Sequence, residues 1–240
     1  RYCRQKNIHD LRQADASLFP NYADHLRHLH QRNGQHLCPR YQHRQLRLIA
    51  QLFRYLYQQQ YLPFDLSRHL PILHSPPYRP RDILSREQIM TLLQQPNLSA
   101  PSGYRDRTIF EILFSTGLRS GELCRLELSD LNLEERILRV NQGKGQKDRL
   151  VPFGKIAAAY LKEYLREIRP WHLYTRPFHT RVFVTELGAP LWTQKLRNIL
   201  CHYLQQAGLP DTITVHSLRH TCATEMLRGG ASLRHIQELL

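Results

Sequence analysis

The chain has 240 residues, of which 41% are hydrophobic, so it can bury a core in one large domain or two modest ones. Its net charge of +14 predicts a polyanionic partner, although a highly soluble basic protein, or one that binds an anionic membrane surface, would share that charge. No apolar run approaches the roughly 20 residues of a membrane-spanning helix. Five scattered cysteines without a C-x-x-C pair, and no visible signal peptide, predict a protein of the reducing cytoplasm.

The first 82 residues predict a small helical bundle with a basic surface. Helices are expected at residues 21–32 and 39–60, with a short one near 66–70, and the second repeats apolar residues at the spacing of a buried stripe. Arginines on its other faces are candidate DNA contacts: Arg40, Arg44 and Arg47. The spacing of three histidines in the first helix allows a metal, but a solvated or DNA-facing helix is favoured, and no metal is expected: His25, His28 and His30. A proline-rich linker at residues 71–82 marks the domain boundary.

Residues 83–240 predict a second, mostly helical domain with a small antiparallel sheet. The fold class is therefore mainly α, of the α+β type. In chain order we expect a helix after a capping box at 85–88, helices at 104–116 and from 119, strands at 136–140 and 148–152, a helix at 156–168, a strand at 182–184, and helices at 192–207, 215–228 and from 232.

Three stretches of this second domain contain residue types that can hold a phosphodiester. In T-G-L-R-S-G-E-L, Arg119 begins a helix, where free N–H groups favour an anion, and Glu122 lies one turn on, able to hold the arginine. In N-Q-G-K-G-Q-K, glycines flank Lys144 at a hairpin tip. In V-H-S-L-R-H-T, His216 and Arg219 share one helix face. Taken singly, the three could be a surface ion pair, an exposed turn lysine and a solvated helix face.

Taken together and in this order, the three stretches resemble the tyrosine recombinases, also called the phage integrase family. The resemblance covers most of residues 85–240, and the basic segment before the linker is similar to that family's SAM-like core-binding domain. It implies a DNA recombinase or integrase, of a Xer-like or transposon type, that needs no metal or ATP. In that reaction a tyrosine attacks the scissile phosphate, giving a 3′-phosphotyrosyl link and a free 5′-hydroxyl, which then attacks the phosphotyrosine of a partner strand.

The resemblance also implies roles for particular residues. The family's catalytic positions are matched by Arg119, Lys144, His216 and Arg219, and its supporting positions by Glu122 and His220. Further candidate DNA contacts on the hairpin are Lys147 and Arg149. Two arginine forks would neutralise the charge that builds on the non-bridging oxygens, the lysine would protonate the leaving 5′-oxygen, and the histidine would assist proton transfer. Because a phosphotyrosine bond keeps the energy of the broken bond, no cofactor is expected.

The nucleophilic tyrosine of the family is not at its expected place in this chain. Family spacing puts it after Arg219 and beyond Leu240, whereas the last tyrosine is Tyr203. The chain also starts at Arg1 rather than Met and stops within an amphipathic pattern. We therefore expect a fragment, truncated before the nucleophile, that binds double-stranded DNA but does not cleave it. The parent protein is expected to be active, and the resemblance implies that it forms a tetramer on paired sites, away from membranes.

Two other functions remain open at this point. A non-catalytic DNA-binding regulatory protein could keep the same fold, although it would have no need for Lys144 and His216. A type IB topoisomerase shares the chemistry, but the H-S-L-R-H pattern is more similar to a recombinase.

Overall fold

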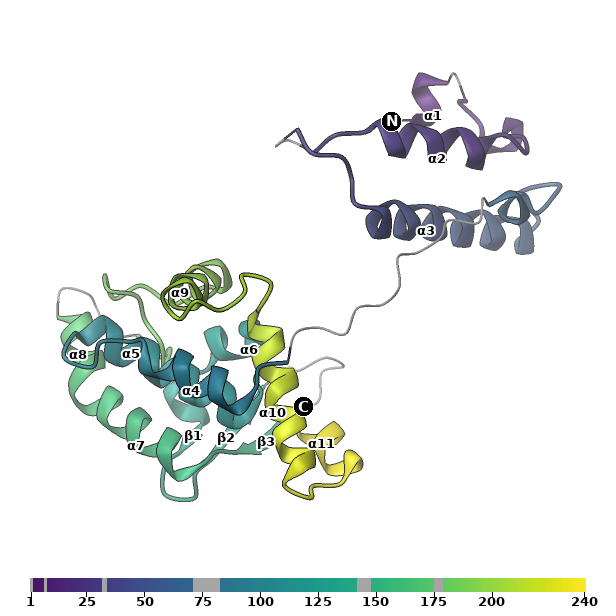
Figure 1. Cartoon of the computed structure of the whole chain (residues 1–240). Helices are drawn as coiled ribbons and strands as arrows, with labels where there is room; N and C mark the ends of the chain where they lie inside the picture. The colour runs from purple at the N-terminus through teal and green to yellow at the C-terminus, as the bar shows by residue number, and fades with distance from the viewer. Residues whose placement is uncertain (1, 7, 32–33, 71–82, 142–147, 175–178) are drawn as a thin grey trace. The chain divides into compact units, whose positions relative to one another are not determined.

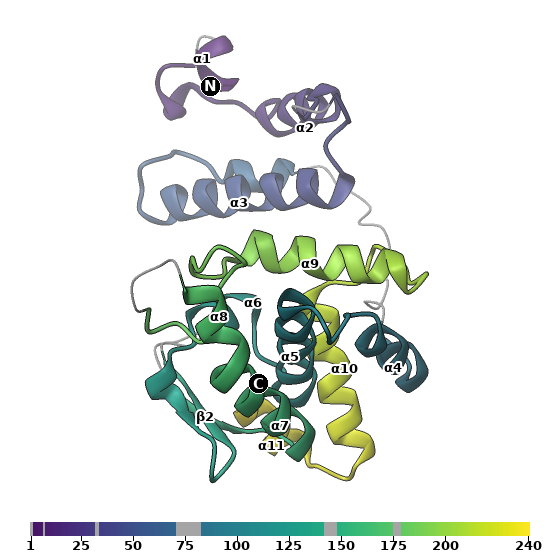
Figure 2. The same cartoon turned by 90° about the vertical axis from the view of Figure 1, so that its left-hand side faces the viewer.

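The computed structural model describes residues 2–6, 8–31, 34–70, 83–141, 148–174 and 179–240 (Figures 1 and 2). The chain divides into two compact units, Arg1–Arg79 and Pro80–Leu240. The predicted linker at 71–82 and the hairpin tip at 142–147 lie outside the described residues. Within the described part, no helix is both long and apolar enough to cross a membrane.

In the N-terminal unit, α2 (Leu18–His28) lies beside α3 (Pro39–Gln58) and packs against it (Figure 1). Pro39 begins α3 because a proline in the first turn loses no helical hydrogen bond. The rings of Phe19 and Phe53 meet edge-on in the small core, with centroids 5.4 Å apart. Short helical segments complete the unit: α1 (Tyr2–Gln5), Leu11–Gln13 and Leu66–His69.

The first predicted helix of this unit was placed too far along the chain. Instead of ending near residue 32, α2 ends at His28, and the backbone of Leu29 is extended. His30 then pairs with His36 in an antiparallel bridge. The chain therefore turns back earlier than the apolar pattern indicated, because this bridge takes the place of another helical turn.

Helix α5 (Pro101–Thr116) is central to the C-terminal unit. It contacts α4 (Arg86–Gln94), α7 (Lys155–Glu163) and α10 (Val215–Arg228). Its buried side chains come from most of its circumference and include Ile109, Phe110, Ile112 and Leu113. Since α6 (Ser120–Arg125) follows directly after this rigid helix, α5 fixes where Arg119 lies relative to α10.

A three-stranded antiparallel sheet lies beside these helices (Figure 1). Its strands are β1 (Leu131–Asn132), β2 (Ile137–Val140) and β3 (Arg149–Pro152), in that order. Leu138 lies opposite Val151, and both are fully buried, which fixes the register of the predicted hairpin. The expected fold class, mainly helical with a small antiparallel sheet, is confirmed. Strand β1 was not predicted, because two residues are too few to show a period.

Two further expectations for this unit were wrong in detail. Residues 182–184 form no regular strand, since Val184 pairs only through an isolated bridge to Pro190. The helix predicted at 156–168 is α7, followed by a wide π-type turn at Tyr164–Ile168 and by α8 (Arg169–Leu173). Proline in α8 has no N–H for the regular helical bond, and the wide turn keeps Tyr164 fully buried. The remaining helices are α9 (Thr193–Gln206) and α11 (Leu233–Leu239).

Candidate active site

The turn between α5 and α6 faces α10 and fits it closely. Gly117 ends α5 in the left-handed conformation, with φ of +62°. A Cβ atom at this position would lie 2.5 Å from Leu240 Cδ2, so the end of that leucine side chain would have to shift, and the positive φ would strain any residue other than glycine. The Gly117 carbonyl accepts a hydrogen bond of 2.7 Å from Arg219 Nη1. The turn that precedes Arg119 is thus joined directly to the helix that contains Arg219.

Glu122 accepts hydrogen bonds from two arginines on both of its carboxylate oxygens. Arg119 donates from its backbone nitrogen to Oε2 at 2.8 Å and from Nη1 to Oε1 at 2.7 Å. Arg149, the first residue of β3, donates from Nη1 to Oε1 at 3.1 Å and from Nη2 to Oε2 at 2.9 Å. Arg219 Nη1 lies 3.8 Å from Oε2. One carboxylate therefore gathers three guanidinium groups, which together we call the arginine cluster.

Burial and proximity set the charges in the arginine cluster. The Glu122 side chain is 3% exposed and that of Arg219 is 9% exposed, whereas that of Arg119 is 37% exposed. Burial alone raises the pKa of Glu122, but the hydrogen bonds from Arg149 and Arg119 outweigh it and lower that pKa to about 2. Burial, followed by the Arg119 charge, lowers the pKa of Arg219 to about 10, which leaves it a cation at neutral pH. Three cations and one anion give a positive site that is open to solvent at Arg119 and suits a phosphate.

His216 and His220 lie in the first two turns of α10, next to Arg219. Thr214 caps the N-terminus of this helix, and its hydroxyl oxygen accepts a hydrogen bond of 3.2 Å from the Ser217 nitrogen. His216 is exposed and His220 is half-buried, and their rings meet edge-on with centroids 4.5 Å apart. Because residues three apart share a helix face, the exposed imidazole lies on the same side of α10 as Arg219.

The hairpin residues expected to take part divide into two groups. Lys144 and Lys147 lie outside the described residues. Arg149, expected as a DNA contact, is instead turned inward: its side chain is 15% exposed and both terminal nitrogens bond to Glu122. Its Nε also donates to the Leu239 carbonyl oxygen at 2.8 Å. This correction follows from the packing of β3 against α6 and α11, which the local sequence does not show.

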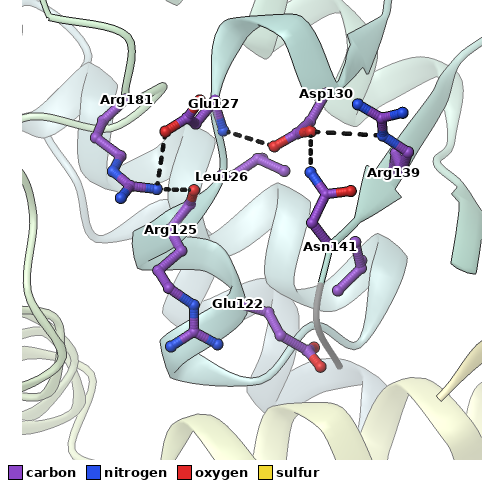
Figure 3. Close-up of a pocket in the computed structure, with 9 residues that line it drawn as sticks. Glu122, Arg125, Leu126, Glu127, Asp130, Arg139, Asn141 and Arg181 are labelled. Carbon is purple, nitrogen blue, oxygen red and sulfur yellow. Dashed lines mark hydrogen bonds and ion pairs between the residues drawn. The ribbon is translucent and has the colours of Figure 1, made fainter. Parts of the chain in front are cut away.

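A polar pocket of about 200 Å³ adjoins Glu122 on the side of the β-sheet (Figure 3). The carboxylates at its rim are paired: Asp130 accepts a hydrogen bond from Asn141 at 2.5 Å and lies 3.7 Å from Arg139 Nε. Glu127 lies 3.3 Å from Arg181 Nη1. Since Asn141 directly follows β2, the two Asp130 pairs hold the base of the β2–β3 hairpin against the short helical turn Leu128–Asp130, which follows α6.

The three arginines predicted on the N-terminal unit lie together along α3. A shallow pocket of about 320 Å³ is lined by Arg40, His43, Arg44, Arg47, Leu48 and Gln51. All three arginines are exposed. This side of α3, which we call the α3 basic face, therefore offers several cations to one ligand.

Known proteins support an assignment of this arrangement to a family. Residues 82–240 match the phage integrase family. Tyrosine recombinase XerC 2 from Ralstonia nicotianae is 32% identical over 239 residues, which span 100% of this chain and 68% of that relative. The chain belongs to the phage integrase family. The resemblance that the three sequence stretches predicted is thus confirmed.

Two further proteins are similar to this chain, one in sequence and one in fold. Tyrosine recombinase XerD from Staphylococcus saprophyticus is 40% identical over 159 residues, which are 66% of this chain and 53% of that relative. This chain therefore spans about half to two thirds of the length of the curated relatives that it matches. The Tn1549 transposon integrase, solved in complex with transposon right end DNA, shares the fold with a TM-score of 0.77 at 18% identity, over 96% of this chain and 78% of that one.

Proposed function

We propose that these residues form the DNA-binding and phosphate-activating part of a site-specific recombinase or integrase. The observation that most supports this function is the arginine cluster. It presents a partly exposed guanidinium, Arg119, beside a buried one, Arg219, with one buried carboxylate that leaves the site positive. Such a site can neutralise the charge that develops on a phosphodiester during in-line attack. The curated relatives named tyrosine recombinases support the same reaction class.

Each residue of the site has a role in the proposed reaction. Arg119 and Arg219 bind the two non-bridging oxygens of the scissile phosphate, and their positive charge stabilises the transition state. Lys144 protonates the leaving 5′-oxygen, and His216 assists proton transfer near neutral pH. A tyrosine forms the covalent 3′-phosphotyrosyl intermediate, and a 5′-hydroxyl later displaces it, so the scheme needs no metal or nucleotide cofactor.

We further propose that the nucleophilic tyrosine is not among these 240 residues. The test is to incubate a labelled, nicked duplex with this chain and with the gene product that contains it, then to denature the samples and run them on a gel. The gene product should form a covalent adduct, whereas the 240-residue chain should shift the duplex only on a native gel. An adduct with this chain alone would place the nucleophile within it. No adduct with either protein would favour a non-catalytic DNA-binding regulator.

The α3 basic face is proposed to contact the phosphates of double-stranded DNA. Replacing Arg40, Arg44 and Arg47 together by alanine should weaken duplex binding by the 240-residue chain. It should also flatten the slope of log Kd against log salt by about 0.9 for each phosphate that the variant no longer neutralises, because fewer counterions are released on binding. Fluorescence anisotropy over a salt series measures both effects.

A control variant removes three arginines from other parts of the N-terminal unit. The side chains of Arg12, Arg27 and Arg68 are 72%, 57% and 79% exposed and are paired with aspartates. Replacing these three by alanine should change the salt slope little. If both triple variants weaken binding equally, net charge alone governs the affinity and the α3 basic face is not the contact surface.

A further inference from the structure

Arg149 differs from Arg119 in its burial and from both other arginines of the cluster in its bonds. Its side chain is 15% exposed, compared with 37% for Arg119. Its Nη1 and Nη2 bond to the two oxygens of Glu122, and its Nε bonds to the Leu239 carbonyl oxygen at 2.8 Å. All three nitrogens of this guanidinium therefore bond inside the protein, and its planar fork is directed at Glu122 and not at solvent.

The bonds made by Glu122 show what the Arg149 fork can do for the site. Each Glu122 oxygen accepts one bond from Arg149 and one from Arg119, so the carboxylate cannot rotate without breaking bonds to both. Arg119 has a long and partly exposed side chain, and its guanidinium donates to Glu122 Oε1. The orientation of Arg119 therefore depends on a carboxylate whose own orientation is fixed by Arg149.

We infer that Arg149 is a positioning residue, which acts through Glu122 to hold Arg119 in the geometry that phosphodiester cleavage needs. This inference rests on the proposed function. Arg149 touches no reacting atom, and it acts on the rate of cleavage by reducing the motion of Arg119. A misplacement of a catalytic group by about 1 Å can slow a reaction by roughly 100-fold, so the fork is expected to matter for the rate. Because Arg149 begins β3, it also joins the β2–β3 hairpin to the phosphate site.

The test is a double-mutant cycle on the gene product that contains this chain, with single-turnover cleavage of a nicked duplex as the readout. Arg149→Gln should slow cleavage by about 10- to 100-fold. The Kd for the duplex should stay within about twofold, because the residue does not contact DNA. Arg149→Lys should recover part of the rate only, since an ammonium cannot bond to both Glu122 oxygens in a planar fork. In a Glu122→Gln background, Arg149→Gln should cause little further loss, because the two residues act through one interaction.

Arg166→Gln is the matched control. Arg166 lies in the wide turn after α7, its side chain is 63% exposed, and it pairs with Glu163 and Glu167 at the surface. This variant removes one positive charge from the same unit and should leave the cleavage rate unchanged. Thermal melting of each variant shows whether a slower rate comes from unfolding. If Arg149→Gln does not fold, Arg149→Lys takes its place: a partly reduced cleavage rate at an unchanged Kd supports the inference, and a normal rate contradicts it.

Four outcomes separate this role from its alternatives. If Arg149→Gln weakens duplex binding as much as it slows cleavage, Arg149 contacts DNA and the inference is wrong. If the effects of Arg149→Gln and Glu122→Gln multiply, Arg149 acts through its bond to Leu239 and not through Glu122, which also overturns it. If Arg149→Gln cleaves at the normal rate, this inference fails while the proposed function stands. If the unmodified protein does not cleave at all, the proposed function fails, and this inference with it.

Discussion

Replacing Arg219 by alanine is expected to slow strand cleavage by the gene product about 1000-fold or more, with duplex binding changed only a few-fold. The physical reason is that Arg219 supplies a fixed cation to a charge that exists mainly in the transition state, whereas binding is spread over many phosphates. Arg119→Ala should have the same signature. Cleavage is measured as covalent adduct in a single turnover, and binding by anisotropy with the same duplex.

Arg228 offers a control for this prediction on the same helix. Its side chain is 64% exposed and paired with Glu225, so Arg228→Ala removes a charge from α10 without touching the site. It should leave cleavage unchanged. Arg219 also bonds to the Gly117 carbonyl, so a loss of folding, cleavage and binding together in Arg219→Ala would assign it a structural role instead. Arg219→Lys would distinguish the two roles, since it keeps the charge but not the fork.

Replacing Glu122 by alanine is expected to destabilise the chain by about 3–5 kcal/mol. The carboxylate is 3% exposed and is the anion shared by three guanidinium groups, so its removal leaves buried positive charges facing one another. Denaturant unfolding followed by circular dichroism measures the change. Glu163→Ala is the control, because Glu163 is 40% exposed and its ion pair with Arg166 lies at the surface. That variant should cost less than about 1 kcal/mol.

The Glu122 carboxylate also predicts how the free energy of unfolding changes with pH. The pKa of Glu122 is about 2 in the folded chain, against an ordinary value of 4.5, so the unfolded chain binds the proton more readily. This group therefore stabilises the fold above about pH 4.5, and the contribution, about 3 kcal/mol, is lost as the pH falls toward 2. Glu122→Gln should remove this part of the acid dependence. If the unfolding free energy of Glu122→Gln falls with acid as it does in the unmodified chain, the Glu122 carboxylate is not stabilised by the arginines in the folded state.

The side-chain contacts that the sequence predicted correctly join residues that are close together in the chain. Ser85 and Gln88 form the predicted capping box, and Arg119 lies one turn before Glu122, so short-range spacing was enough to pair them. The bond between Arg149 and Glu122 joins residues 27 apart, and that between Arg219 and Gly117 joins residues 102 apart. Such bonds depend on how β3 and α10 pack against α6, which no local pattern determines.

The net charge of the chain does not show which arginines are available to a partner. Arg105 belongs to the same positive total, yet its side chain is fully buried and bonds to Asp106 and Glu186, at 2.7 Å and 2.9 Å from Nη2. Charge and local position alone do not separate it from Arg119, because both are arginines close to a helix N-terminus and near a carboxylate; only the T-G-L-R-S-G-E-L stretch singles out Arg119. The structure adds that Arg105 is a buried ion-paired residue, whereas Arg119 is partly exposed.

The close fit at Gly117 has a consequence for the geometry of the polypeptide itself. The Leu239 carbonyl oxygen bonds to Arg149, and the Leu240 side chain lies beside Gly117 in the turn that precedes Arg119. The C-terminal end of α11 (Leu233–Leu239) is thus in contact with both elements that hold Glu122 and its arginines. The geometry of the phosphate site therefore depends on where α11 lies, and a change that loosens this helix should act on the site without touching a catalytic side chain.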